Sequence, residues 1–169
     1  MIKGFLFDLD GVIVDTAKYH FLAWKRLADE LGINFTIEDN ELLKGVSRMS
    51  SLDIILELGN KRITEAQKNE LATRKNEWYV EFITKMAADE ILPGALDFII
   101  KARGLQIKIA LGSASKNAHT ILNRLEISGY FDAIISGNEV VTAKPDPEVF
   151  LLGATEIGLQ PSECVVFED

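Results

Sequence analysis

The pattern of apolar and polar positions divides the chain into a leading strand, a helical middle section and a regular alternation of helices and strands. An apolar run over residues 4–9 predicts the leading strand. After Thr16, the apolar residues Phe21, Trp24, Leu27 and Leu31 recur at helical spacing, and helix-start signals follow, so that residues from about 16 to 86 are predicted to be mainly helical. Pro93 and Gly94 then interrupt the pattern. The middle section is therefore predicted to be a helical insertion after the first strand.

Two polar pairs mark helix starts inside this insertion. Thr36 followed by Asp39 predicts one start. Thr64 with Gln67 forms a capping-box pattern, which predicts a long helix that continues to about Met86.

Beyond the interruption, helical and extended patterns alternate. The predicted helices cover residues 95–103, 116–125 and 147–157, and the predicted strands cover residues 108–111, 133–136 and 164–167. Short strands separated by helices are typical of parallel βα units with right-handed crossovers, and the leading strand is expected to join their sheet. The predicted fold class is α/β, with a Rossmann-like parallel sheet core (residues 1–15 and 87–169) and an inserted helical cap domain (residues 16–86).

Composition narrows the classes of partner. The chain has 169 residues, 47% of them hydrophobic, and a formal net charge of −8. This balance argues against a nucleic acid or an anionic membrane as partner, since both need a basic surface, but it allows a phosphorylated small molecule. Asp8 and Asp10 interrupt any early apolar segment, so no signal peptide is expected, and Cys164, as the one cysteine, is expected to be a buried apolar side chain. We expect a cytoplasmic monomer.

Two carboxylates stand at the end of the leading strand. Asp8 and Asp10 occur in FDLDG, and residues at i and i+2 of a strand point to one face. Acids that share a face repel each other unless a cation lies between them. Since open α/β sheets bind their ligands at the carboxyl ends of the strands, a divalent cation with a phosphoryl substrate is the natural interpretation.

The later strands also end in polar residues. Ser113 follows one strand within GSASKN, Lys144 stands in AKPDP, and Glu168 and Asp169 follow the last strand. In a parallel sheet these ends meet at one edge. Acids there would hold a metal, serine and lysine would hold phosphoryl oxygens, and one carboxylate would remain as nucleophile.

These motifs resemble those of the haloacid dehalogenase superfamily of phosphotransferases. FDLDGV matches the first motif, and Ser113, Lys144 and the pair Glu168–Asp169 match the second, third and fourth in the family's order. The resemblance covers the whole chain. KGVSR, RKNEWY and GSASKN, together with His20 and Trp24, further resemble the β-phosphoglucomutase family. That resemblance implies interconversion of β-glucose 1-phosphate and glucose 6-phosphate through a bisphosphate.

The resemblance also implies a role for each matching residue. Asp8 would become the aspartyl phosphate, Asp10 would be the general acid and base, and Ser113 and Lys144 would steady the transferring group. Mg²⁺ would be held by Asp8, the Asp10 backbone carbonyl, Glu168 and Asp169. The sugar phosphate would be bound by His20, Trp24, Lys44, Gly45, Val46, Arg48, Ser51, Lys75, Ser115, Lys116 and Asn117, with Arg48 gripping its second phosphate.

Structural interpretations stand beside several of these roles. Ser115 is equally suited to cap a helix, and His20 is as often a packed residue as a ligand. Trp24 favours apolar packing, and Lys75 lies in a charged stretch that is compatible with a solvated helix face.

Two further functions remain open. A sugar-phosphate phosphatase would transfer the phosphoryl group to water. A non-catalytic phosphate-binding module would bind phosphate without transferring it. The family pattern predicts another βα unit after Asp169 that this sequence lacks. On that expectation, metal binding and activity would be weak. Magnesium titration of this chain and of a C-terminally extended chain would test it by comparing their affinities for the ion.

Overall fold

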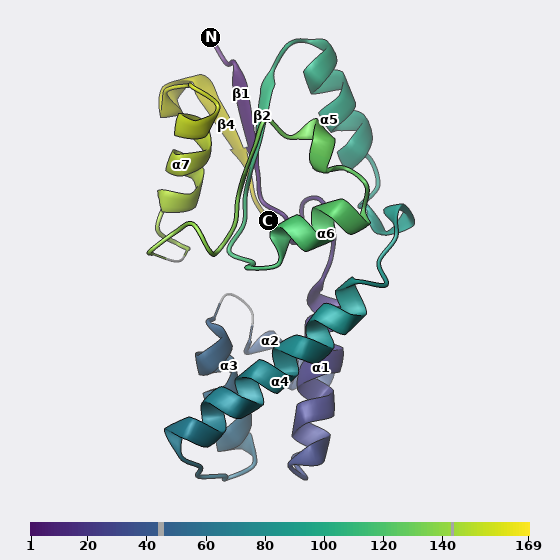
Figure 1. Cartoon of the computed structure of the whole chain (residues 1–169), viewed down its shortest axis with the longest axis vertical. Coiled ribbons are helices and arrows are strands. Elements are labelled where there is room, and N and C mark those ends of the chain that lie inside the picture. Colours follow the sequence, from purple (N-terminus) through teal and green to yellow (C-terminus); the bar gives the residue numbers. More distant parts are fainter. Residues whose placement is uncertain (44–45, 143) are drawn as a thin grey trace. The chain divides into compact units, whose positions relative to one another are not determined.

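The chain divides into two compact units. The computed structural model describes residues 1–43, 46–142 and 144–169 (Figure 1). Met1–Thr16 and Ile83–Asp169 form the first, which we name the sheet unit. Ala17–Phe82 form the second, which we name the helical unit.

Among the residues that the structure describes, four parallel strands build the sheet unit. They are β1 (Gly4–Phe7), β2 (Lys108–Gly112), β3 (Ala133–Ile135) and β4 (Cys164–Phe167), in the order β3-β2-β1-β4. The register pairs Phe7 with Leu111 on one side and with Phe167 on the other. Three strands therefore end level with one another, as the alternation of helices and strands predicted, and the α/β class is confirmed.

Helices cover both faces of this sheet. Figure 1 shows α7 (Glu148–Glu156) on one side and α5 (Ala95–Gly104) and α6 (Ala118–Arg124) on the other. Short 3-10 turns occur at Ala88–Glu90, Ser128–Tyr130 and Pro161–Glu163. Leu6 of β1 and Ala110 of β2 pack against Ala154 of α7, so the middle strands are buried on this face.

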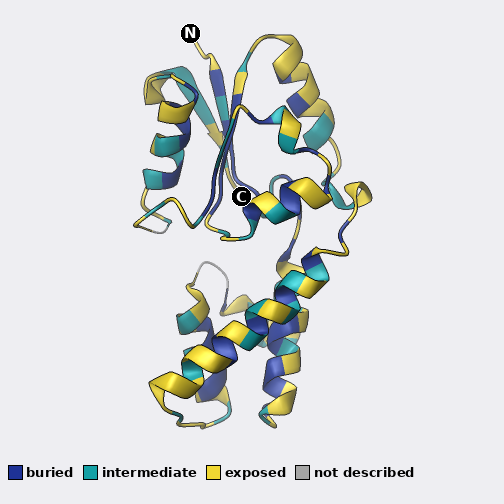
Figure 2. Cartoon of the chain, in the orientation of Figure 1, coloured by how far each residue is buried: buried dark blue, intermediate teal, exposed yellow. Residues whose placement is uncertain are grey.

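The helical unit has its own apolar core. It contains α1 (Ala17–Glu30), α2 (Ile37–Glu41), α3 (Arg48–Leu58) and α4, which runs from Glu65 to Ile83 and so ends one residue inside the sheet unit. Figure 2 shows that these helices bury one face and expose the other. The buried cluster comprises Trp24, Leu27, Ala28, Ile33, Phe35, Leu43, Leu52, Ile55, Leu56, Leu71 and Ala72. Its apolar packing stabilises the unit, since helices of this length are marginal alone.

The predicted helix starts at Thr36 and Thr64 are confirmed. Thr36 caps α2 and completes a capping box with Asp39. The Thr64 backbone N–H donates to Gln67 Oε1, and the Gln67 N–H donates to Thr64 Oγ1. Both pairs satisfy backbone N–H groups that the first turn of a helix leaves without partners.

Four local predictions were wrong. The helix after β2 begins at Ala118 rather than residue 116, and its N-cap is Asn117 rather than Ser115. The long helix α4 ends at Ile83 rather than Met86. Cys164 is only partly buried, because β4 is an edge strand.

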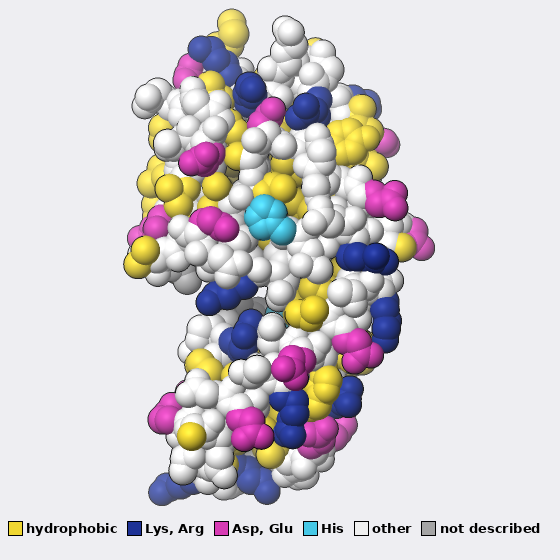
Figure 3. Space-filling model, in the orientation of Figure 1, with side chains coloured by type: hydrophobic (Ala, Val, Ile, Leu, Met, Phe, Trp, Pro, Cys, Tyr) yellow, Lys and Arg dark blue, Asp and Glu magenta, His cyan; other side chains and the backbone are white. Residues whose placement is uncertain are grey.

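Charged side chains of both signs are interspersed over the face shown in Figure 3. Among the described residues, no helix combines the length and the apolar character needed to cross a bilayer.

Candidate active site

The sheet brings three of the polar motifs to one edge. Asp8 follows Phe7, and its backbone N–H donates to the Phe167 carbonyl at 2.9 Å. Glu168 directly follows that phenylalanine, and Ser113 directly follows β2. The parallel register thus places the first, second and fourth motifs side by side, at the edge where α/β sheets bind ligands.

Lys144 joins two carboxylates of this edge. Its Nζ lies 2.9 Å from Asp8 Oδ1 and 2.9 Å from Glu168 Oε1. The side chains of Asp8 and Lys144 are 12% and 20% exposed, whereas Glu168 is 43% exposed. Burial raises the pKa of Asp8, and the hydrogen bond and charge of Lys144 act in the opposite direction. A shielded carboxylate with a lysine beside it suits nucleophilic attack on a phosphoryl group.

Asp10 differs from Asp8 in its surroundings. Its Oδ1 accepts hydrogen bonds from the Thr16 hydroxyl and from the Thr16 N–H, the latter at 3.3 Å. Burial raises the pKa of Asp10 to about 6; the Asp8 charge adds to this and the Thr16 hydroxyl opposes it. Two carboxylates whose pKa values are set apart by their surroundings can take different roles in one reaction.

The loop after β2 is folded around Ser113. This serine is 1% exposed, and its Oγ accepts from the Ser115 N–H at 3.1 Å. The Ser115 Oγ in turn accepts from the Asn117 N–H at 3.2 Å, so it orders the turn before α6 without being the N-cap. Lys116 is exposed and Asn117 is partly buried. The arrangement of hydroxyls and backbone N–H groups suits phosphate binding.

The loop over residues 136–139 packs against the loop that carries Ser113. A Cβ on Gly137 would lie 2.2 Å from the Ala114 carbonyl oxygen, so only glycine allows this approach. The Asn138 Nδ2 donates to the Lys116 carbonyl at 3.0 Å, and the Glu139 carboxylate accepts from the Ser136 N–H. No local pattern in the sequence predicts these supports.

The acids at the sheet edge fit a hard cation in their chemistry. Asp8, Glu168 and Asp169 supply carboxylate oxygens, the donor type that Mg²⁺ prefers. Asp169 lies against Gly11, where an added Cβ would come within 2.5 Å of its Oδ2. Over the described ranges, no three acidic, histidine or cysteine side chains converge into a ready metal cluster. Lys144 instead occupies the space between Asp8 and Glu168.

Two predicted cap residues, His20 and Lys75, form a hydrogen-bonded pair within the helical unit. Lys75 is 2% exposed, and its Nζ lies 2.9 Å from His20 Nδ1 and 4.5 Å from the Trp24 ring centre. Burial, and secondarily the Arg48 charge, lower the pKa of Lys75 to about 7. Burial, then Lys75 and Arg48, lower the pKa of His20 to about 3. Tyr79 stacks on His20 with ring centres 4.1 Å apart. The expected alternative of a solvated Lys75 is wrong, because its amine is buried.

The remaining predicted positions differ in exposure. Arg48 lies on the surface at the start of α3, and partial desolvation lowers the pKa of its guanidinium. Val46 is 42% exposed and Ser51 is 3% exposed. Trp24 is 3% exposed and belongs to the apolar core, as its packing interpretation predicted. Lys44 and Gly45 lie outside the described residues.

Comparison with known proteins decides the family. The model of the haloacid dehalogenase-like hydrolases matches residues 2–169. The chain belongs to this family. It is therefore an enzyme of the haloacid dehalogenase type, as its four ordered motifs predicted.

Individual family members are similar over almost the whole chain. A β-phosphoglucomutase of Bacillus subtilis is 44% identical over 170 residues, which cover 99% of this chain and 75% of that protein. A fructose-1-phosphate phosphatase of Escherichia coli is 32% identical over 168 residues, which cover 98% of this chain and 86% of that protein. A β-phosphoglucomutase from Clostridium difficile, known from its crystal structure, is 47% identical in sequence and superposes with a TM-score of 0.89. The match covers 100% of this chain and 77% of that chain. The family's members thus include both a mutase and a phosphatase with extensive similarity to this chain.

Proposed function

We propose that this protein is a magnesium-dependent mutase that interconverts β-D-glucose 1-phosphate and glucose 6-phosphate through glucose 1,6-bisphosphate. Asp8 attacks phosphorus and becomes an aspartyl phosphate, while the bond to the sugar oxygen breaks. Asp10 gives that oxygen a proton and later takes one from the accepting hydroxyl. A carboxylate with a pKa of about 6 can do both near neutral pH.

The contact between Lys144 and Asp8 carries this proposal. A cation 2.9 Å from the nucleophile is placed to balance negative charge on the transferring group. Ser113, at the same sheet edge, adds a hydroxyl donor. The similarity to two β-phosphoglucomutases, at 44% and 47% identity, supports the choice of sugar phosphate.

The acids of the sheet edge are proposed to hold Mg²⁺. The ligands are Asp8, the Asp10 backbone carbonyl, Glu168 and Asp169. When bound, the ion would neutralise charge on phosphoryl oxygens. We propose that Lys144 turns from Glu168 toward the phosphoryl group in that state, so that Asp8 keeps one cationic neighbour throughout.

A mutase must also hold the phosphate that is not being transferred. Arg48 is the proposed residue for this second phosphate, since a guanidinium binds phosphate with two hydrogen bonds. Ser115, Lys116 and Asn117 are proposed to assist it. The sugar is proposed to contact His20, Trp24, Lys44, Gly45, Val46, Ser51 and Lys75, and Trp24 contributes at most a ring edge, because it is buried in the core.

The products distinguish the candidate functions. The protein is incubated with β-glucose 1-phosphate, Mg²⁺ and a trace of glucose 1,6-bisphosphate. We expect glucose 6-phosphate with little free phosphate. Free phosphate alone would establish a phosphatase instead, an alternative favoured by the 32% identity to the Escherichia coli fructose-1-phosphate phosphatase. If neither glucose 6-phosphate nor free phosphate forms, the remaining candidate is a non-catalytic phosphate-binding module.

A further inference from the structure

The Arg48 guanidinium is held by a neutral partner. Its Nη2 donates to Asn76 Oδ1 at 2.8 Å. Arg48 begins α3 and Asn76 lies on α4, so the bond joins two helices. Within residues 1–43, 46–142 and 144–169, no carboxylate forms an ion pair with Arg48. The guanidinium is thus oriented by an acceptor that leaves its charge uncompensated.

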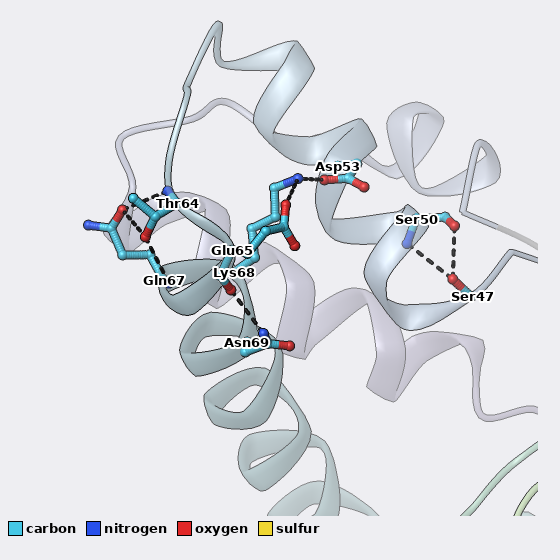
Figure 4. Close-up of polar contacts among 8 residues, drawn as sticks. All are labelled: Ser47, Ser50, Asp53, Thr64, Glu65, Gln67, Lys68 and Asn69. Atoms are coloured by element: carbon cyan, nitrogen blue, oxygen red, sulfur yellow. Dashed lines mark hydrogen bonds and ion pairs between the residues drawn. The ribbon is translucent and has the colours of Figure 1, made fainter.

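A second contact between the same helices fixes this geometry. Lys68 of α4 forms an ion pair with Asp53 of α3 at 2.7 Å (Figure 4). Arg48 precedes Asp53 on α3 and Asn76 follows Lys68 on α4, as expected for antiparallel helices. These two contacts therefore lie along the same pair of helices, at different positions on each.

The start of α3 is held as well. The Ser47 side chain accepts from the Ser50 N–H at 3.1 Å and caps the helix (Figure 4). The cap therefore fixes the backbone of Arg48, and Asn76 holds the guanidinium at the other end of its side chain. A long side chain held at both ends loses little further rotamer freedom when it binds a ligand.

Arg48 adds positive charge to the helical unit. The positive charge of Arg48 lowers the pKa of both Lys75 and His20, two groups of the same unit. Lys75 Nζ itself lies within hydrogen-bond distance of His20 Nδ1. An anion that reached Arg48 would meet a local excess of positive charge in a chain whose net charge is −8.

We propose that Asn76 is a positioning residue for phosphate binding: its amide oxygen orients the Arg48 guanidinium and preserves its full charge for a sugar-bound phosphate. This inference rests on the proposed function, in which Arg48 binds the phosphate that is not transferred. A carboxylate at this position would orient the guanidinium equally well but would satisfy its charge internally. The neutral amide is therefore the chemically decisive feature.

Substitution separates orientation from charge. Asn76→Asp keeps the acceptor and adds a negative charge, and we expect the affinity for glucose 6-phosphate, measured by calorimetry, to fall about tenfold. Asn76→Ala removes the acceptor alone, and we expect a loss of about threefold. Asn69→Asp is the matched control, because it makes the same change two turns earlier on α4, where Asn69 donates to the Glu65 carbonyl (Figure 4). It should change the affinity by less than about twofold.

A double-mutant cycle shows whether the effect runs through Arg48. Asn76→Asp should weaken binding no further in an Arg48→Ala background. Hydrolysis of a small phosphate ester, which has no second phosphate, should stay within about twofold of the wild type in the Asn69→Asp control. If Asn76→Asp matches Asn69→Asp, or if its effect persists without Arg48, the inference is overturned. Should Asn76→Asp fail to fold, the uncharged Asn76→Ala decides by the same cycle.

The outcome is independent of the product formed. If the wild type releases only free phosphate, the mutase is refuted. If Asn76→Asp nevertheless loses more glucose 6-phosphate affinity than Asn76→Ala, and Asn76→Ala more than Asn69→Asp, the role of Asn76 stands. Equal affinities in all variants would refute the role of Asn76 even in an active mutase.

Discussion

Lys75 Nζ lies 2.9 Å from His20 Nδ1, so two groups that are often cationic share one hydrogen bond inside the helical unit. Burial and the nearby Arg48 charge disfavour a proton on either group. With a pKa of about 3, His20 is neutral near pH 7, and its ring can accept from the lysine. The pair therefore titrates mainly at Lys75.

This pair predicts a pH dependence of stability. The pKa of Lys75 is about 7 in the folded chain and about 10.4 in the unfolded chain. Between these values the unfolded state binds more protons, so the free energy of unfolding rises with pH. From pH 7 to pH 9, the wild type should gain about 2 kcal/mol relative to Lys75→Met.

Urea unfolding at the two pH values measures this difference. Lys61→Met serves as the control, since Lys61 is exposed, and it should follow the wild type. A Lys75→Met variant whose stability changes with pH in parallel with the wild type would show that the buried amine keeps its ordinary pKa.

Lys144→Met should lower the turnover of both sugar phosphates and small esters by about 100-fold or more. The substitution keeps the length of the side chain but removes the cation beside Asp8 and Glu168. The pKa of Asp8 should rise further, because the charge that opposes its burial is gone. Steady-state kinetics on both substrates tests this, and a loss confined to sugar phosphates would place Lys144 outside the transfer chemistry.

Gly137→Ala should lower kcat/KM by about 10- to 100-fold for both kinds of substrate. The new Cβ would meet the Ala114 carbonyl at 2.2 Å, and the loop that carries Ser113 would have to move. Gly104→Ala is the matched control, because no atom lies within 4 Å of a Cβ there. Equal activity of the two variants would show that the loop accommodates the methyl group without displacing Ser113.

Leu52→Ala should destabilise the helical unit by about 2–5 kcal/mol. Leu52 is fully buried in the cluster formed by α1, α3 and α4. Leu58, at the end of α3, is 42% exposed, and its replacement by alanine should cost less than about 1 kcal/mol. Denaturant unfolding of the two variants tests whether this core holds the unit together.

The strand-end residues could be predicted because they depend on short-range patterns. Asp8, Ser113 and Glu168 each follow an apolar run, and a parallel sheet necessarily gathers such positions. The capping pairs Thr36–Asp39 and Thr64–Gln67 are local as well. The sequence therefore predicted the fold class and this edge of the sheet.

The supporting contacts could not be predicted in the same way. Thr16 bonds to Asp10 across six positions, and Asn76 bonds to Arg48 across 28, through packing that no local pattern encodes. The interpretation of Ser115 as an N-cap is wrong, because the turn before α6 extends two residues further than the apolar pattern indicates. Lys75 sits among charged neighbours in sequence, and only the packing of α1 against α4 buries it.

The central claim is that Asp8 itself carries the phosphoryl group. Intact-protein mass spectrometry after mixing with Mg²⁺ and glucose 1,6-bisphosphate measures this directly. The account predicts an acid-stable, hydroxylamine-sensitive mass increase of one phosphoryl group in the wild type and none in Asp8→Asn. A phosphoryl adduct that survives the Asp8→Asn substitution would contradict it.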